Sequence, residues 1–87
     1  MTLKINGRAI PLAELPTGCS GRLEVADPER ISQRLGELGL VAGTRISVVR
    51  RGPLGDPVEL ELRGYRLCVR RADLEGLEVL PDGSSPA

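Results

Sequence analysis

The sequence holds few side chains that could carry catalysis. It contains no histidine, which excludes schemes in which an imidazole activates a nucleophile. Ser20 follows Cys19 in the run GCSG, but the glycine spacing of a nucleophile elbow is absent. The sequence also lacks the G-x-x-x-x-G-K-[ST] phosphate-binding loop. We therefore expect a protein that is not an enzyme and that needs no cofactor.

The two cysteines do not form a recognisable metal or redox motif. Cys19 and Cys68 lie 49 positions apart, and neither belongs to a CxxC pair. The N-terminus lacks the basic start and long apolar run of a secretory signal, so we expect a cytoplasmic protein with reduced thiols. Cys19 could be a reactive thiol in a loop, but we favour a small side chain packed near one end of the domain.

Carboxylates are the remaining candidates for chemistry. Twelve are present, and Fe(II) accepts oxygen ligands. Asp56 is the best single candidate because it lies in a constrained loop, yet an Asp that precedes Pro more often accepts N–H groups of its own loop. The other carboxylates are dispersed on strand faces and beside arginines. We therefore assign no metal site and keep direct binding of a divalent transition-metal ion as an alternative.

Charge is balanced overall but uneven locally. Residues 45–71 contain seven arginines and three acidic residues, although the whole chain has a net charge of zero. This excess could be a docking face for an acidic partner or RNA, or a solvated sheet face with cross-strand pairs such as Glu61 opposite an arginine. RNA would need stacking platforms, and the parity of the lone Tyr65 places it inward. We expect no nucleic-acid partner.

The patterning predicts one small, mainly β domain. Apolar and polar residues alternate in five segments: 21–26, 45–51, 58–63, 65–70 and 77–80. Gly64 supplies the turn of a hairpin between the third and fourth segments. Strands this short cannot form two stacked sheets in 87 residues, so we expect a small SH3-like five-stranded antiparallel barrel with one or two short helices. No apolar stretch is long enough to span a bilayer.

One helix is predicted from Asp27 to Gly39. Asp27 suits the N-cap, Pro28 suits the first helical position, and Gly39 suits the left-handed position that ends a helix. The contact that such an ending expects lies between Leu40 and Leu35. An apolar stripe follows the helical period, formed by Ile31, Leu35 and Leu38.

Shorter turns connect these elements. Leu12 and Leu15 lie between prolines and fit a single helical turn docked on the core, and residues 71–76 fit another turn. Pro53 and Gly55 match the second and fourth places of a type I turn. We expect residues 1–11 to form an extension with a short strand near Leu3, and residues 81–87 to form a disordered tail.

Four segments together resemble the ferrous-iron transport protein A (FeoA) family. Residues 34–44 resemble its element R-L-x-x-L-G-L-x-x-G-T, and residues 51–58 its loop aPLGDP. Residues 64–70 are similar to its hairpin strand GyrlaLR, with Cys68 where a small residue is usual. Residues 12–18 fit its start, L-x-x-L-x-x-G. The ordered set spans residues 12–80, which we expect to form a stand-alone FeoA-like domain.

The resemblance implies a small cytosolic accessory protein of bacterial ferrous-iron uptake. Its partner would be FeoB, a membrane permease with a cytosolic G-protein domain, at which this chain would bind and modulate transport or GTP turnover. The chain would reach the inner face of the membrane through that partner, without inserting itself. Related domains occur in iron-dependent repressors after a DNA-binding segment. Only eleven residues precede Leu12, so we do not expect a repressor.

Two surfaces are predicted to bind the partner. The first is the helical stripe around Leu35 and Leu38, which a small barrel could leave partly exposed or could use simply to cap its core. The second is the loop between two prolines with Leu54 at its tip, because a rigid loop lowers the ordering cost of binding. Arg51 immediately precedes this loop. The edge strands would allow a weak homo-oligomer, but we expect a monomer as readily.

Overall fold

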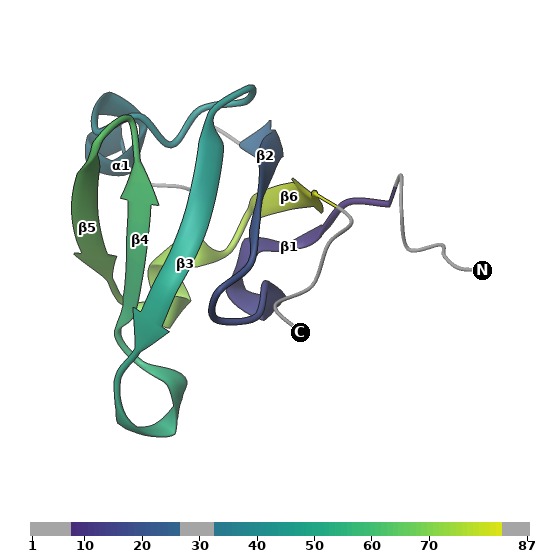
Figure 1. Cartoon of the computed structure of the whole chain (residues 1–87). Coiled ribbons are helices and arrows are strands. Elements are labelled where there is room, and N and C mark those ends of the chain that lie inside the picture. Colours follow the sequence, from purple (N-terminus) through teal and green to yellow (C-terminus); the bar gives the residue numbers. More distant parts are fainter. Residues whose placement is uncertain (1–7, 27–32, 83–87) are drawn as a thin grey trace.

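The computed structural model describes residues 8–26 and 33–82 (Figure 1). The described elements comprise six strands, three 3-10 turns and one short α-helix. The strands are β1 (Ile10–Pro11), β2 (Ser20–Ala26), β3 (Arg45–Arg51), β4 (Val58–Leu62), β5 (Tyr65–Val69) and β6 (Leu77–Pro81). The helix is α1 (Gln33–Glu37), and the 3-10 turns are η1 (Leu12–Glu14), η2 (Pro53–Gly55) and η3 (Arg71–Leu74).

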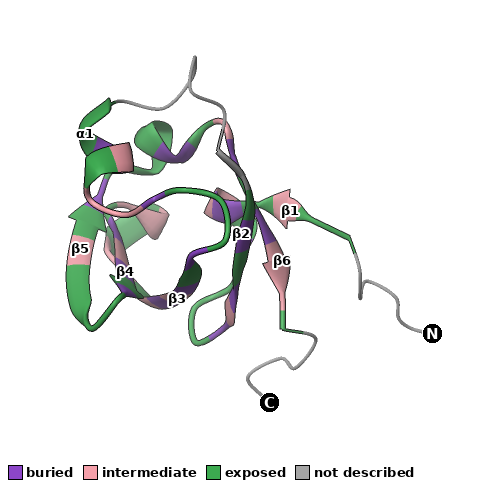
Figure 2. Cartoon of the chain, turned by 90° about the horizontal axis from the view of Figure 1, so that it is seen from above, coloured by how far each residue is buried: buried purple, intermediate pink, exposed green. Residues whose placement is uncertain are grey.

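All six strands join one antiparallel sheet in the order β1-β6-β2-β3-β4-β5. The sheet curls around a single core, as the view from above makes plain (Figure 2). The mainly β fold with few short helices is confirmed. The predicted number of five strands is wrong, because Ile10 and Pro11 pair with Val79 and Glu78 to add β1 at one edge. An edge is where a strand tolerates Pro, which has no N–H to donate.

The core consists of aliphatic side chains from every strand after β1, from the turns η1 and η3, and from Leu35 of α1. The alternation predicted for β4 is confirmed, since its three apolar residues are buried while Glu59 and Glu61 are half-buried and exposed. Leu12 and Leu15 are buried beside η1, as expected, and Leu74 is buried in η3. The fully buried large side chains are Leu12, Leu15, Leu23, Leu40, Ile46, Val48, Val58, Leu60, Leu62, Leu74, Leu77 and Val79.

Tyr65 departs from its predicted inward position. Its side chain is 38% exposed, although Leu62 directly opposite in the register is buried. The parity is right, but β5 is an edge strand and has no described strand on its other side. The tyrosine therefore lies at the rim of the core, not inside it.

The end of α1 forms as the sequence predicts. The N–H of Leu40 donates to the carbonyl oxygen of Leu35 at 3.1 Å, and Gly39 takes φ of +110°. This is the hydrogen bond of a Schellman ending, which requires a residue in the left-handed region. Thr44 then donates its hydroxyl to the carbonyl oxygen of Gly39 at 2.9 Å. The predicted start at Asp27, the stripe position Ile31 and the extension near Leu3 lie outside the described residues.

Candidate functional site

The loop between β3 and β4, residues 52–57, projects from one end of the sheet (Figure 1). Its base is closed by a hydrogen bond of 2.8 Å from the N–H of Gly52 to the carbonyl oxygen of Pro57. A β-carbon at Gly52 would lie 2.5 Å from the carbonyl oxygen of Asp56. The segments that enter and leave the loop can therefore pack this closely only with glycine at position 52. A further hydrogen bond of 2.8 Å runs from the N–H of Arg71 to the Asp56 carboxylate.

Leu54 occupies the tip of this loop, and its side chain is fully exposed. Its backbone has φ of 60° and ψ of 21°, in the left-handed region that disfavours a residue with a branched side chain. The predicted type I turn is therefore wrong, because that turn needs negative φ at its third position. The chain reverses direction within a loop whose base is closed by the hydrogen bond between Gly52 and Pro57.

The Asp56 side chain connects the 52–57 loop to η3. Its carboxylate accepts the backbone N–H of Arg71, which opens η3. The sequence predicted an acceptor for N–H groups of the loop itself, whereas the observed donor belongs to η3, 15 residues further along the chain. Among the described residues, no group of three or more His, Cys, Asp or Glu side chains is placed to hold a metal ion.

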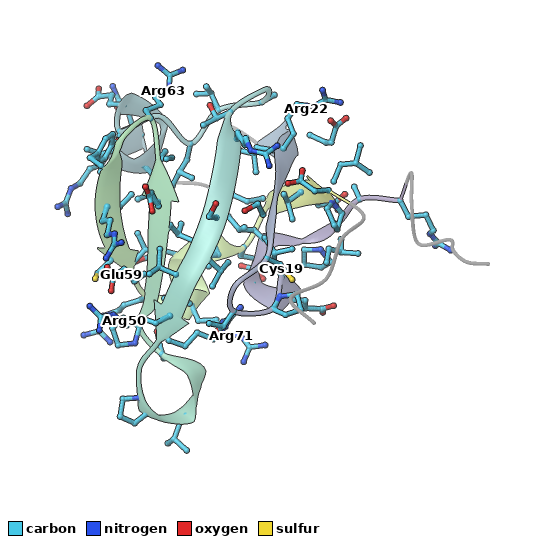
Figure 3. All side chains as sticks on the ribbon, viewed as in Figure 1. Cys19, Arg22, Arg50, Glu59, Arg63 and Arg71 are labelled. Carbon is cyan, nitrogen blue, oxygen red and sulfur yellow. The ribbon has the colours of Figure 1, made fainter. Side chains whose placement is uncertain are left out.

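The outer face of β3, β4 and β5 carries a line of ion pairs. The Arg50 Nε atom lies 2.6 Å from a carboxylate oxygen of Glu59, and Arg66 lies 3.4 Å from Glu59 and 3.8 Å from Glu61. Figure 3 shows Arg50 and Glu59 on this face, near the end of the sheet where the loop begins. The hydrogen bond from Arg50, joined by the charges of Arg50 and Arg66, lowers the pKa of Glu59 against the opposing effect of partial burial.

These pairs account for part of the local positive charge. Glu61 stands directly opposite Arg66 in the register, so the interpretation as a solvated face with cross-strand pairs holds here. Arg45 is paired with Asp82. In the described part of the chain, four arginines of this segment form no ion pair: Arg51, Arg63, Arg70 and Arg71. Figure 3 places Arg63 and Arg71 at opposite ends of the sheet.

The four predicted partner-binding residues lie at two separate places. Arg51 and Leu54 lie at the loop end, whereas Leu35 and Leu38 belong to α1 and the turn after it at the opposite end (Figure 1). Leu35 is buried in the core and Leu38 is half-buried against it. Arg51 donates from Nη2 to the carbonyl oxygens of Ala13 and Leu15 at 2.9 and 2.7 Å, so it connects η1 to β3. A role for Arg51 in binding stays a prediction.

The cysteines are both free. Cys19 is buried, and Figure 3 places it between η1 and β2, which agrees with a packed small side chain. Cys68 is exposed on β5 and faces Glu59 in the register. No helix among the described residues is long and apolar enough to cross a membrane.

A family model described as the FeoA domain matches residues 10–81, the whole span from β1 to β6. The chain belongs to the FeoA family. The match agrees with the resemblance seen in the sequence, and its first residues are those that add β1 to the sheet.

Solved structures of FeoA proteins resemble this FeoA-family chain along most of its length. The FeoA protein of Chlorobium tepidum is 38% identical, with a TM-score of 0.71 over 88% of this chain and 75% of that one. FeoA of Stenotrophomonas maltophilia, solved in complex with zinc, is 32% identical, with a TM-score of 0.67 over 82% and 89%.

A third structure has a higher TM-score than these two but a lower sequence identity. The FeoA-like protein of Clostridium acetobutylicum is 25% identical, with a TM-score of 0.79 over 92% of this chain and 94% of that one. The Stenotrophomonas protein is described as a prokaryotic SH3 domain protein. The fold of this FeoA-family chain is thus SH3-like, as the strand pattern predicted.

Proposed function

We propose that this chain is a non-enzymatic accessory protein of ferrous-iron uptake that binds the cytosolic part of a FeoB-type permease. Family membership supports the pathway, and the Stenotrophomonas relative is described as a candidate ferrous iron transport activating factor. In this proposal iron is the cargo of the permease. The accessory protein acts by shifting the permease between conformational states through contacts that differ between them.

The observation that carries the proposal is the position of Leu54. Neither burial nor backbone preference explains a fully exposed leucine in the left-handed region at the tip of a closed loop. A partner with an apolar pocket would bury this side chain at little ordering cost, because the hydrogen bonds at Gly52 and Asp56 already fix the loop. We therefore place the contact with the permease at Leu54.

The test is calorimetric titration of this protein into the isolated G-protein domain of the cognate permease, with and without GTP. We expect binding whose affinity depends on the nucleotide, and Leu54→Asp should abolish it while leaving the melting temperature unchanged. Val41→Asp is the matched control, since Val41 is an exposed apolar residue in the turn before β3. Equal loss of binding in both variants would remove the assignment to Leu54.

Absence of binding in both nucleotide states would move the contact to the membrane part of the permease. The same titration should then be repeated with the full-length permease in detergent or nanodiscs. If the intact permease also fails to bind, the accessory function is wrong for this chain.

The alternative is that the chain itself binds a divalent transition-metal ion and acts as a metal-responsive module. The zinc complex of the Stenotrophomonas relative is the observation that favours it. Anaerobic titration with Fe(II) or Mn(II) would raise the melting temperature if the folded chain binds the ion tightly. An unchanged melting temperature at a large excess of either ion would discard this alternative.

A further inference from the structure

The second feature with binding potential is the open edge of β5. This strand is the last in the sheet, and among the described residues it pairs with β4 alone. Its hairpin closes through the two residues Arg63 and Gly64, whose φ angles of 52° and 84° are those of a type I′ turn. Its backbone on the far side is therefore available for further pairing.

The register identifies which groups face outward. The pair that flanks a two-residue turn, Leu62 and Tyr65, exchanges both hydrogen bonds, and such pairs alternate along an antiparallel ladder. Arg66 and Cys68 therefore direct their N–H and C=O groups away from β4. The open stretch ends at Arg70, whose carbonyl oxygen accepts the N–H of Asp73 at 2.9 Å.

A groove runs beside this edge. A cavity of about 440 Å³ lies between α1 and β5, and four consecutive residues from Leu67 to Arg70 line it. Successive side chains of a strand point to opposite faces of the sheet, so four in a row can border one cavity only along the strand's edge. Figure 2 shows α1 and β5 on the same side of the curled sheet. The groove therefore offers room where a further strand would lie.

The lining indicates the chemistry of an occupant. Leu38 and Leu67 are half-buried and present apolar surface, while Arg34 and Arg70 add two positive charges against the single carboxylate of Asp73. Neither arginine forms an ion pair with a described residue. An extended segment with apolar residues at its centre and carboxylates near its ends would match both features.

A second copy of this chain fits the edge poorly. Two β5 strands paired antiparallel around Cys68 would place Arg66 opposite Arg70 twice, and like charges directly opposite destabilise a sheet. The described ends of the chain also lie far from this edge, since β1 and β6 occupy the opposite side of the molecule (Figure 2). The charge pattern favours a partner with carboxylates.

We propose that the edge of β5 and the groove beside α1 bind an extended acidic segment of another protein, which adds to the sheet as a further strand. The backbone groups of Arg66 and Cys68 supply the pairing, and the two arginines select carboxylates. This surface does not include Leu54, although its end at Arg70 lies beside the base of the 52–57 loop, where the N–H of Arg71 donates to the Asp56 carboxylate. The proposal rests on the backbone edge of β5 and on Arg34 and Arg70, so it stands independently of the contact placed at Leu54.

The first test is selection from a displayed library of random linear dodecapeptides against the immobilised chain. We expect enrichment of peptides that combine acidic and apolar residues. Hydrogen exchange measured by NMR should then show the Arg66 and Cys68 amides protected only when such a peptide is bound, with Leu67 and Val69 protected throughout. Enrichment of basic peptides, no enrichment, or enriched peptides that leave those two amides unprotected would each overturn the proposal.

Variants separate the edge from general effects on folding. Cys68→Pro removes one outward N–H at a position where an edge strand tolerates Pro. We expect it to lower the affinity for the selected peptide on the order of tenfold. Cys68→Val keeps the N–H and should bind normally. Equal affinity of the two variants would contradict strand addition.

Charge reversal tests the selectivity independently of that substitution. Arg34→Glu together with Arg70→Glu should lower the affinity for the acidic peptide on the order of tenfold. Arg71→Glu, an exposed arginine outside the groove, should leave its affinity unchanged. If the control weakens binding as much as the double variant, the assignment to an acidic partner is wrong. The assignment is also wrong if, without peptide, protection of the Arg66 and Cys68 amides rises with protein concentration, because the edge then pairs with a second copy of the chain.

Discussion

The Nη2 atom of Arg51 lies 2.7 Å from the carbonyl oxygen of Leu15, 36 residues earlier in the chain. The same atom lies 2.9 Å from the carbonyl oxygen of Ala13. One guanidinium thus satisfies two carbonyls at the end of η1 and holds that turn against the last residue of β3. The loop that begins at the next residue, Gly52, therefore starts from a fixed point.

Replacing Arg51 with Met should lower the free energy of unfolding by about 1–3 kcal/mol, because charge-assisted hydrogen bonds to two half-buried carbonyls are lost. Urea denaturation followed by circular dichroism measures this. Arg71→Met is the control, since the Arg71 side chain is exposed and forms no ion pair among the described residues. Equal stabilities of the two variants would show that the contacts to Ala13 and Leu15 contribute little.

Leu54→Asn should leave stability unchanged or raise it by up to about 1 kcal/mol. The leucine side chain is fully exposed, so its removal loses no burial, and Asn tolerates the left-handed region better than Leu. The measurement is the melting temperature. A fall of several degrees would mean that Leu54 stabilises the isolated chain, and its exposure would then no longer point to a partner.

Gly52→Ala should destabilise the chain by about 1–3 kcal/mol, the usual cost of overpacking. The added methyl group would lie 2.5 Å from the carbonyl oxygen of Asp56 and 2.8 Å from Cδ of Pro57. The loop must open to admit it, so we also expect weaker binding to the permease. The close packing would be contradicted if the variant kept the stability of the parent chain and hydrogen exchange showed the amide of residue 52 still protected.

Gly36→Ala should act in the opposite direction and stabilise the chain by about 0.5–1 kcal/mol. Gly36 lies inside α1, and a β-carbon there would meet no other atom within 4 Å. The same denaturation experiment measures it beside Gly52→Ala. Destabilisation would indicate that other atoms lie closer to Gly36 than they do in this structure.

Glu59→Gln should be less stable than the parent chain at pH 7, with a gap that closes in acid. The hydrogen bond from Arg50 holds the pKa of Glu59 below its ordinary value. A carboxyl whose pKa is lower when folded contributes its full stabilisation above the unfolded-state pKa of about 4.3, and loses it as the pH falls through the folded-state pKa. Urea denaturation between pH 7 and pH 3 tests this. A gap independent of pH would rule out the proposed coupling.

Local patterns determined most of the fold. Strict alternation placed Val58, Leu60 and Leu62 in the core, because successive side chains of a strand alternate between its faces. Gly39 marked the end of the helix, since the left-handed position there favours a residue without a side chain. The ordered motifs were enough to indicate the FeoA family, which the family model confirms.

Long-range packing decided what the patterns did not. Pairing with β6 adds Ile10 and Pro11 to the sheet, and no local signal marks two such residues as a strand. Tyr65 has inward parity but becomes exposed because its strand is the last in the sheet. The turn at Leu54 differs from the predicted type because Leu54 takes a positive φ, inside a loop that the Gly52–Pro57 hydrogen bond closes.

The candidate surfaces, too, depend partly on local sequence and partly on long-range packing. The sequence by itself determined that Leu54 lies between prolines in a short loop, since the fixed φ of Pro and the freedom of Gly restrict such a segment locally. Only the tertiary structure decided that Arg51 turns inward to η1 and that β5 keeps an open edge beside α1. Both depend on which distant segments meet, and spacing along the chain carries no information about the order in which strands pair.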